Sequence, residues 1–344
     1  MALPDWLEAD PRIRHHHHRP ATLGVTSDYP EWVEPELRDA LAAIGVKRLW
    51  RHQVTAADAA FRGRHVALAT GTASGKTLAY LLPVLAATVS GRTGFATASG
   101  PLGINRRHSA LYLAPTKALA HDQLRVCRSL GVPGWQPVAL DGDSEAAERR
   151  FARDFGSLIL SNPDMLHRAV LPNHQQWTRL LASLRYVVID EAHRYRGVFG
   201  AQVSAVLRRL RRLANHYGAD PVFISASATV SEAGELLTRL AGVEPVVEIT
   251  TDDSARASLD YLLWQPDEDP HHETADLLAH LVRDGKQTLA FTSSRVQAEL
   301  IALRAQRKVG DIAPIESYRG GYLPSDRREL EAGLQSGALR GVAC

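Results

Sequence analysis

A glycine-rich stretch that ends in Lys76 and Thr77 is the feature of this sequence that most directly suggests chemistry. It reads TGTASGKT over 70–77, follows the apolar run HVALAT and precedes the apolar segment LAYLLPVL. A turn between a strand and a helix directs backbone N–H groups toward phosphates, and the helix dipole there favours negative charge. We expect Lys76 to reach the β and γ phosphates of a nucleotide and Thr77 to bind Mg²⁺. The residues expected to contact the nucleotide here are Thr72, Ala73, Ser74, Gly75, Lys76 and Thr77.

The stretch departs from the general phosphate-loop pattern G-x-x-x-x-G-K-[ST] at its first position. Thr70 stands where that pattern has a glycine, and Gly71 comes one place late. On this evidence alone, a glycine-rich turn that merely precedes a lysine remains the alternative.

Two adjacent acids, Asp190 and Glu191, follow a second apolar run, YVVI, in the segment YVVIDEAH. They would lie at the carboxyl edge of a sheet, where α/β proteins bind ligands. Asp190 suits the Mg²⁺ shell, and Glu191 suits the orientation and deprotonation of an attacking water. Because adjacent acids on a solvated turn are common, the pair alone is a weak indication of a site. The phosphate loop upstream makes the indication strong.

The apolar runs that would carry these residues alternate with amphipathic segments. Short runs rich in Val, Ile and Leu begin at 65, 110, 157, 186, 221 and 288. Runs of this length suit strands of a parallel sheet that is buried on both faces. The segment 201–216 has the period of a helix, with Arg208, Arg209, Arg211 and Arg212 off its apolar stripe, which favours a solvated face over a DNA track. We predict a doubly wound α/β fold with a parallel sheet.

Composition shifts divide the chain into four parts. We predict an N-terminal extension over 1–35, a first domain over 36–250, a linker over 251–273 and a partial second domain over 274–344. His15–His18 are expected in a mobile, solvated segment, and 89–109 in a long surface loop.

The composition sets limits on location and partners. The net charge is +2 over 344 residues, so any basic surface must be local. The two cysteines, Cys127 and Cys344, permit no disulfide framework, and Cys127 has the spacing of a core residue. Since no apolar run approaches the ~20 residues that span a bilayer, we expect a cytoplasmic protein without membrane contact.

The motifs together resemble those of the superfamily 2 DEAD/DEAH-box helicases. DEAH at 190–193, TGTASGKT at 70–77 and SAT at 227–229 occur in the order of that family. LWRHQ at 49–53 resembles its Q motif, APTKALAHDQ at 114–123 motif Ia, SNPDML at 161–166 motif Ic, and FTSSR at 291–295 motif IV. The first position of the loop is often not glycine in this family.

The resemblance implies a RecA-like first domain, an incomplete second RecA-like domain, and ATP with Mg²⁺ as cofactors. It implies that Gln53 reads the adenine, that Lys76, Asp190, Glu191 and His193 form the catalytic set, and that Thr77 and Asp190 bind the metal. Ser227 and Thr229 would couple hydrolysis to domain movement. The residues that would grip a nucleic-acid backbone are Thr116, Lys117, Ser161, Asn162, Arg295 and Arg319. For each of these, a capping or solvated role remains equally open.

Two further segments narrow the resemblance. HRYRGVFGAQVSAVLRRL at 193–210 and SYRGGYLPSDRRELEAGL at 317–334 are similar to the MrfA-like helicases and their RecQ-four-like relatives. This implies 3′–5′ movement on single-stranded DNA and a role in DNA repair. An RNA helicase and a nucleotide-switched nucleic-acid-binding module without motor activity are the alternatives.

The family's last motifs are not found in this sequence. The sequence stops at GALRGVAC, about where motif V would start, and holds no Q-x-x-G-R-x-G-R of motif VI. We expect a fragment or a truncated product that binds ATP and Mg²⁺ but hydrolyses slowly, because an arginine finger contributes on the order of 10³–10⁵ in rate.

Overall fold

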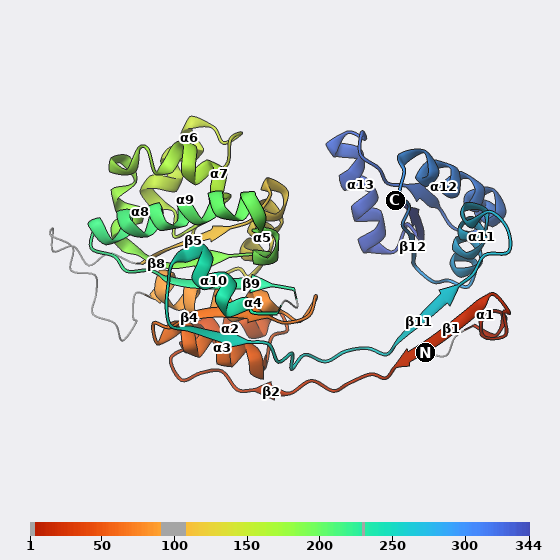
Figure 1. The fold of residues 1–344 in the computed structure, drawn as a ribbon, viewed down its shortest axis with the longest axis horizontal. Helices are drawn as coiled ribbons and strands as arrows, with labels where there is room; N and C mark the ends of the chain where they lie inside the picture. Colours follow the sequence, from red (N-terminus) through yellow and green to blue (C-terminus); the bar gives the residue numbers. More distant parts are fainter. Residues whose placement is uncertain (1–3, 91–107, 229–230) are drawn as a thin grey trace. The chain divides into compact units, whose positions relative to one another are not determined.

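The computed structural model describes residues 4–90, 108–228 and 231–344, which form two compact units (Figure 1). One unit consists of Ala21–Ala257, and the other combines Met1–Pro20 with Ser258–Cys344. Most of the predicted surface loop 89–109 lies outside the described residues. The first twenty residues therefore belong with the second unit, and residues 251–257 belong with the first.

The larger unit contains a parallel seven-stranded sheet in the order β10-β4-β9-β8-β5-β7-β6. Its strands are β4 (His65–Ala69), β5 (Ser109–Leu113), β6 (Pro137–Ala139), β7 (Leu158–Ser161), β8 (Leu184–Ile189), β9 (Val222–Ser227) and β10 (Val246–Ile249). The predicted α/β fold with a parallel sheet is confirmed. The sequence missed β6 and β10, the two edge strands, because Pro137 opens the first and Glu248 interrupts the second, so neither gives a continuous apolar run.

Alternate residues of these strands face two separate cores. Val66 and Leu68 belong to one core cluster, whereas Ala67 and Ala69 belong to the other. The first core packs against α2 (Pro35–Ala43), α3 (Arg51–Phe61), α4 (Lys76–Leu85) and α5 (Lys117–Ser129), and includes Cys127. The second packs against α6 (Ala146–Phe155), α7 (Pro163–Met165), α8 (Thr178–Ser183), α9 (Gly197–His216) and α10 (Ala233–Ala241). A sheet covered on both faces explains why its strands read as continuous apolar runs.

The second unit has a parallel three-stranded sheet in the order β12-β14-β13. The strands are β12 (Thr288–Ala290), β13 (Ile315–Ser317) and β14 (Gly341–Ala343). Three helices accompany them, α11 (Pro270–Arg283), α12 (Arg295–Val309) and α13 (Pro324–Ser336). Its core cluster joins the first two helices to the sheet through residues such as Leu278 and Ile301.

A two-stranded ribbon brings the N-terminal residues into this second unit. Strand β1 (Ile13–Arg19) pairs antiparallel with β11 (Leu259–Trp264), and the short helix α1 (Asp5–Glu8) precedes it (Figure 1). The expectation of a mobile segment at His15–His18 was wrong, because main-chain pairing holds these residues in β1. His16 and His18 also contact Asp260 at 2.8 and 2.7 Å. The predicted linker 251–273 likewise contains strand β11.

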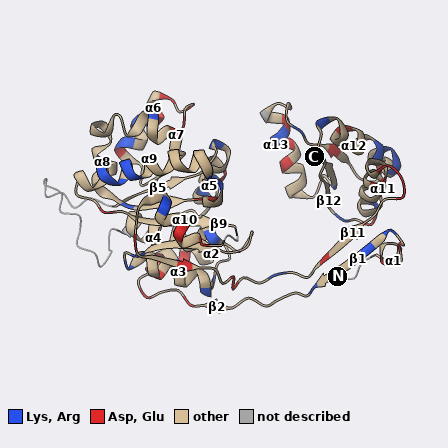
Figure 2. Cartoon of the chain, in the orientation of Figure 1, with Lys and Arg blue, Asp and Glu red and all other residues tan. Residues whose placement is uncertain are grey.

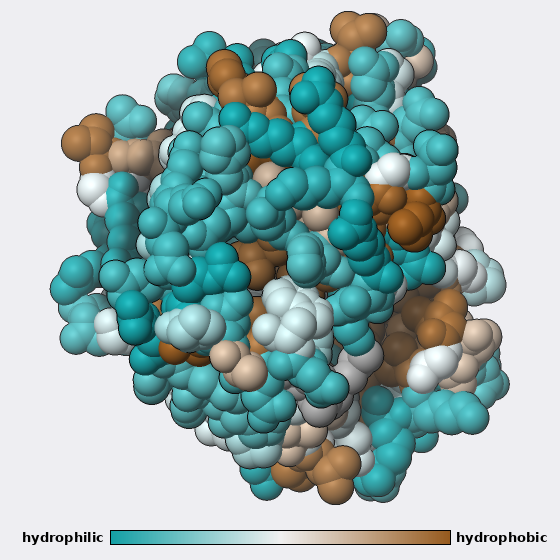
Figure 3. Space-filling view, turned by 90° about the vertical axis from the view of Figure 1, so that its right-hand side faces the viewer, coloured by the Kyte–Doolittle hydropathy of each residue, from teal (hydrophilic) through white to brown (hydrophobic). Residues whose placement is uncertain are grey.

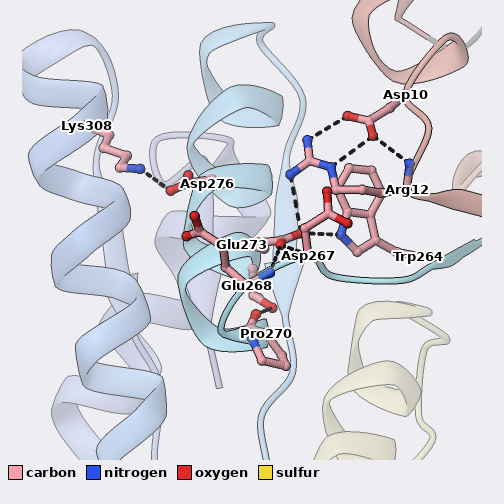
Figure 4. A network of polar contacts seen from close by, with 10 residues as sticks. Asp10, Arg12, Trp264, Asp267, Glu268, Pro270, Glu273, Asp276 and Lys308 are labelled. Atoms are coloured by element: carbon pink, nitrogen blue, oxygen red, sulfur yellow. Dashed lines mark hydrogen bonds and ion pairs between the residues drawn. The ribbon is translucent and has the colours of Figure 1, made fainter.

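A polar network around Glu273 fastens this ribbon to α11 (Figure 4). The Glu273 carboxylate accepts hydrogen bonds from the backbone N–H groups of Asp267 and Glu268 at 2.7 and 2.8 Å and from Trp264 Nε1 at 2.7 Å. Arg12 lies over the Trp264 ring and donates to Glu273 at 3.3 Å. Main-chain, aromatic and charged groups from the N-terminal segment and from residues 264–268 thus meet at one buried carboxylate.

Helix α9 carries several basic residues, as Figure 2 shows, and three of its arginines donate hydrogen bonds to backbone carbonyls. Arg208 donates to the carbonyl of Arg239 at 3.3 Å, and Arg211 donates to that of Gly242. Arg209 donates to the carbonyl of Leu171 at 3.3 Å. Cations near the end of α10 satisfy carbonyl groups that the helix itself leaves unpaired. The predicted solvated face is therefore partly engaged with neighbouring elements.

The surface carries scattered apolar side chains, and the face seen in Figure 3 is largely hydrophilic. No helix within the described ranges combines the length and the apolar character that crossing a membrane requires. The remaining short strands, β2 (Thr26–Ser27) and β3 (Leu49–Trp50), pair antiparallel and lead into α3, which borders the site described next.

Candidate nucleotide site

The loop between β4 and α4 has the backbone that a phosphate cradle requires. Gly75 caps α4 with φ of 76°, and Ala73 also has a positive φ, 58°. A Cβ added at Gly75 would lie 2.5 Å from Gln53 Nε2, so no larger residue fits there without displacing that side chain. The glycine common to the pattern and this loop is therefore fixed by both conformation and space.

Side chains within the loop bond to one another. Lys76 Nζ donates to the carbonyls of Thr70 at 3.1 Å and Gly71 at 2.7 Å. The hydroxyls of Thr70 and Ser74, both buried, lie 2.7 Å apart. Thr70 thus gives the loop an internal hydrogen bond that a glycine in its place would lack. Thr72 and Ala73 are exposed at the tip.

Lys76 lies close enough to three carboxylates for them to act on its charge. Burial lowers the pKa of Lys76, whereas Glu191, Asp190 and Asp252 oppose that shift. An ammonium that is partly desolvated and bonded only to carbonyls gains from an incoming phosphate. The electrostatics of the site therefore suit a polyanion.

The helix α3 supports the loop from one side. Gln53 accepts from the N–H of Trp50 at 2.8 Å and donates to the carbonyl of Gly75 at 2.7 Å. Its neighbour His52 contacts the carbonyl of Ser74 at 3.1 Å, and its other ring nitrogen accepts from the N–H of Asp253 at 3.1 Å. In this structure the Gln53 side chain holds the loop, and its expected role in reading adenine stays a prediction.

The DEAH turn follows β8 directly. Glu191 adopts a left-handed conformation with φ of 49°, and its N–H donates to Asp190 Oδ1 at 2.9 Å. The other Asp190 oxygen accepts from the hydroxyl of Tyr112 on β5. Burial raises the pKa of Asp190, and the phenol and backbone donors act against that shift. A cation next to this carboxylate would stabilise its charged form.

His193 links the turn to β9. Its Nδ1 lies 3.2 Å from Ser227 Oγ and 3.3 Å from Glu191 Oε2. Ser227 is itself buried at the end of β9. The structure thus places the expected coupling residue Ser227 beside His193 of the expected catalytic set. Thr229, the other expected coupling residue, lies outside the described residues.

The sheet order explains how these residues meet. Strand β9 lies between β4 and β8, and all three are parallel. Their carboxyl ends therefore share one edge, which brings the phosphate loop, Ser227 and the two acids together. Pairing of these strands brings Lys76 and Asp190 to the same edge, although more than one hundred residues separate them in the sequence.

The expected nucleic-acid contacts of the larger unit have local structural roles. Thr116 caps α5 by accepting from the N–H of Leu119 at 3.4 Å, and Asn162 caps α7 by accepting from Met165 at 2.8 Å. Lys117 pairs with Asp143 at 2.8 Å on the surface.

Ser161 differs from these residues because it is buried. It is 1% exposed and donates to the carbonyl of Leu140 at 2.6 Å. The expectation that its side chain contacts nucleic acid is therefore not supported by this structure.

The two arginines expected to contact nucleic acid from the second unit lie close together. Arg295 is exposed at the start of α12, and its guanidinium would contact a Cβ at Gly320 at 3.4 Å. Arg319 pairs with Glu299 at 2.5 Å and lies 4.9 Å from the Tyr322 ring centre. A role in nucleic-acid binding remains a prediction for both.

Three site residues escaped the sequence analysis. Tyr112 was taken only as part of an apolar run, although a phenol in a buried strand is a signal that it needs a polar partner. Asp252 was placed in a linker, yet it bonds to Arg256 at 2.7 Å beside Gly71. His52 lies within the LWRHQ segment, but only Gln53 of that segment was assigned a role.

Comparisons with known proteins identify the family of this chain. The model of the DEAD/DEAH box helicase family matches residues 50–236. The ATP-dependent helicase YprA of Bacillus subtilis is 36% identical over 354 residues, which cover 98% of this chain and 44% of YprA. The ATP-dependent helicase HRQ1 of Saccharomyces cerevisiae is 31% identical, over 86% of this chain and 28% of HRQ1.

A solved structure shows the same similarity. The DUF1998 helicase MrfA bound to DNA and AMPPNP superposes with a TM-score of 0.87 at 35% identity, over 98% of this chain and 47% of MrfA. The chain thus spans about half the length of MrfA and YprA. It is RecA-like in fold, and it belongs to the DEAD/DEAH box helicase family.

Proposed function

We propose that this chain is the ATP-binding part of a DNA helicase. The observation that carries the proposal is the meeting of Lys76, Asp190 and Glu191 at one edge of the sheet. Lys76 would bind the β and γ phosphates through its ammonium group. Glu191 would orient and deprotonate the attacking water. His193, through its contact with Ser227, would couple hydrolysis to domain movement.

The donor set fits Mg²⁺. A hydroxyl from Thr77 and a carboxylate from Asp190 are hard oxygen ligands, which this ion prefers together with water and phosphate oxygens. When bound, the ion would neutralise charge that develops on the transferred phosphoryl group. Asp190 is well placed for it because its carboxylate is bonded only by a phenol and one backbone N–H among the contacts described.

DNA is the proposed nucleic acid because MrfA is bound to DNA in its solved structure. We propose 3′–5′ movement on a single strand, with contacts from Thr116, Lys117, Asn162, Arg295 and Arg319 to the backbone. Such contacts position a strand without reading its sequence. We propose a cytoplasmic location because the composition offers no disulfide framework.

Nucleotide binding is the first test of this function. Binding of a fluorescent ATP analogue in Mg²⁺ should be lost in Lys76→Ala and retained in Glu191→Gln, whereas hydrolysis should be lost in both. Glu235→Gln on the surface of α10 is the matched control. Unchanged nucleotide binding in Lys76→Ala would show that the loop is not the phosphate site.

The nucleic acid is tested separately with matched single-stranded DNA and RNA oligonucleotides competing for the chain in the presence of AMPPNP. Preference for DNA supports the proposal, and preference for RNA would overturn the choice of substrate. Equal affinity for DNA with and without nucleotide would argue against a motor, because a helicase must couple the two sites.

A further inference from the structure

Two buried tyrosines stand between the two residues proposed to bind the metal. Tyr112 on β5 is 1% exposed, and its hydroxyl donates to Asp190 Oδ2. Tyr80 on α4 is also 1% exposed and lies one helical turn after Thr77. The two rings lie 6.0 Å apart between centroids and are inclined by 41°.

The tyrosines connect Thr77 to Asp190 through their hydroxyls. Tyr80 interacts through its hydroxyl with the side chains of both Thr77 and Tyr112. Tyr112 in turn bonds to the carboxylate. Tyr80 on α4 and Tyr112 on β5 therefore place two hydroxyl groups in an otherwise apolar region of the first core, and Tyr112 bonds from there to the DEAH turn.

The direction of the hydrogen bond between Tyr112 and Asp190 follows from the carboxylate. An ionised carboxylate only accepts, so Tyr112 must donate to Asp190.

Burial makes the hydroxyl of Tyr112 more than a packing group. A carboxylate next to a core loses water and is stabilised only by the donors that the protein supplies. Asp190 has one such donor on each oxygen, Glu191 N and the Tyr112 hydroxyl. These two bonds fix the rotation of the carboxylate about its side-chain torsions. Partners of metal ligands act in this way and commonly set metal affinity.

We propose that Tyr112, supported by Tyr80, is a positioning residue that orients Asp190 for Mg²⁺ and thereby sets the metal affinity of the nucleotide site. The inference rests on the proposed function, since it assigns the metal to Thr77 and Asp190. It goes beyond that function because neither tyrosine belongs to the motifs that identify the family.

The test is a Mg²⁺ titration of nucleotide binding in Tyr112→Phe, with a fluorescent ADP analogue. The matched control is Tyr186→Phe, which removes a buried hydroxyl on β8 that donates to the carbonyl of Ala60 at 3.5 Å, away from Asp190. We expect the Mg²⁺ concentration at half-saturation to rise about ten-fold in Tyr112→Phe and to stay unchanged in the control. Affinity for the analogue in EDTA should stay unchanged in both.

Tyr80→Phe provides a second measurement that leaves the Tyr112–Asp190 bond in place. It should raise the required Mg²⁺ concentration in the same direction but by less, and electron paramagnetic resonance of Mn²⁺ should report the same order of affinities. Thermal unfolding identifies any variant that does not fold, in which case Tyr80→Phe alone decides.

Two results would overturn the inference. One is a Mg²⁺ requirement that Tyr112→Phe and Tyr80→Phe leave unchanged, and the other is an equal effect of Tyr186→Phe, which would indicate packing rather than positioning. The proposed function fails in a different way, since the wild-type chain would then show no Mg²⁺-dependent nucleotide binding at all.

Discussion

The two units of this chain each contain a carboxylate at the centre of a polar network, and the two carboxylates are bonded in opposite ways. Glu273 accepts from two backbone N–H groups, an indole and a guanidinium. The N–H of Glu268 and the other donors hold the pKa of Glu273 below its ordinary value. Burial instead raises the pKa of Asp190, which has two donors.

The difference separates a structural carboxylate from one prepared for a ligand. At Glu273 the protein itself supplies the compensating positive charge, through Arg12 (Figure 4). At Asp190 the effect of burial outweighs the two donors and the nearby Lys76, and a cation that binds there would stabilise the charged form. Perturbed carboxylates of the second kind are typical of functional sites.

Asp190→Asn should give the largest effect and should act on function alone. We expect ATP hydrolysis to fall by on the order of 10²–10³, because charge stabilisation at the transferred phosphoryl group is lost. The melting temperature should not fall, since the amide removes an incompletely compensated charge. Single-turnover hydrolysis and calorimetry measure the two, with Glu235→Gln as the control. A lower melting temperature in Asp190→Asn would show that Asp190 stabilises the fold, as Glu273 does.

Glu273→Ala should show the reverse pattern. Its loss leaves Trp264 Nε1 and two backbone donors without their acceptor, so we expect the second unit to melt several degrees lower with nucleotide binding unchanged. Lys308→Ala is the control, because its exposed pair with Asp276 in Figure 4 contributes less than about 1 kcal/mol. Hydrogen exchange over 259–273 locates the change. Equal decreases in melting temperature for Glu273→Ala and Lys308→Ala would contradict a central role of Glu273 in this network.

Lowering the pH should weaken the polar network around Glu273. Arg12 lowers the pKa of Asp10 to about 2, and Glu273 is also held below its ordinary value of 4.5. A carboxylate whose pKa is lower in the folded chain stabilises the fold above the unfolded value and loses that contribution as the pH falls through the folded one. We expect exchange over 259–273 to accelerate between pH 4.5 and 2 in the wild-type chain. If hydrogen exchange over 259–273 in Glu273→Gln depended on pH as it does in the wild-type chain, protonation of Glu273 would not be the cause.

Gln53→Glu should have the smallest effect. A carboxylate can still accept from the N–H of Trp50 but cannot donate to the carbonyl of Gly75. We expect nucleotide affinity to fall a few-fold, equivalent to about 1 kcal/mol for one hydrogen bond. Equilibrium binding of the fluorescent analogue measures it, and Thr55→Ala on the exposed side of the same helix is the comparison. No change would mean that Gln53 does not support the loop.

Much of the fold and the centre of the site could be predicted from the sequence. The phosphate loop and the DEAH turn are local patterns, each a strand followed by a turn whose residues are specified within eight positions. Five of the seven strands of the large sheet were predicted for the same reason, because an apolar run and its flanking turn are visible in a short window.

The failures have a physical reason in common. His15–His18 read as a mobile segment because the partner strand β11 lies more than two hundred residues away in the sequence. Ser161 was expected to contact nucleic acid, since the sequence does not show that its hydroxyl bonds to the carbonyl of Leu140, 21 residues away.

The sequence by itself determined the order of the motifs, the residues of the phosphate loop and the family to which the chain belongs. Only the tertiary structure decided which groups complete the site, such as Tyr112 against Asp190, 78 residues apart. It also decided how Arg12 reaches Glu273 across 261 residues. Periodicity and turn chemistry are local, whereas strand order, which brings distant side chains together, depends on packing of the whole unit.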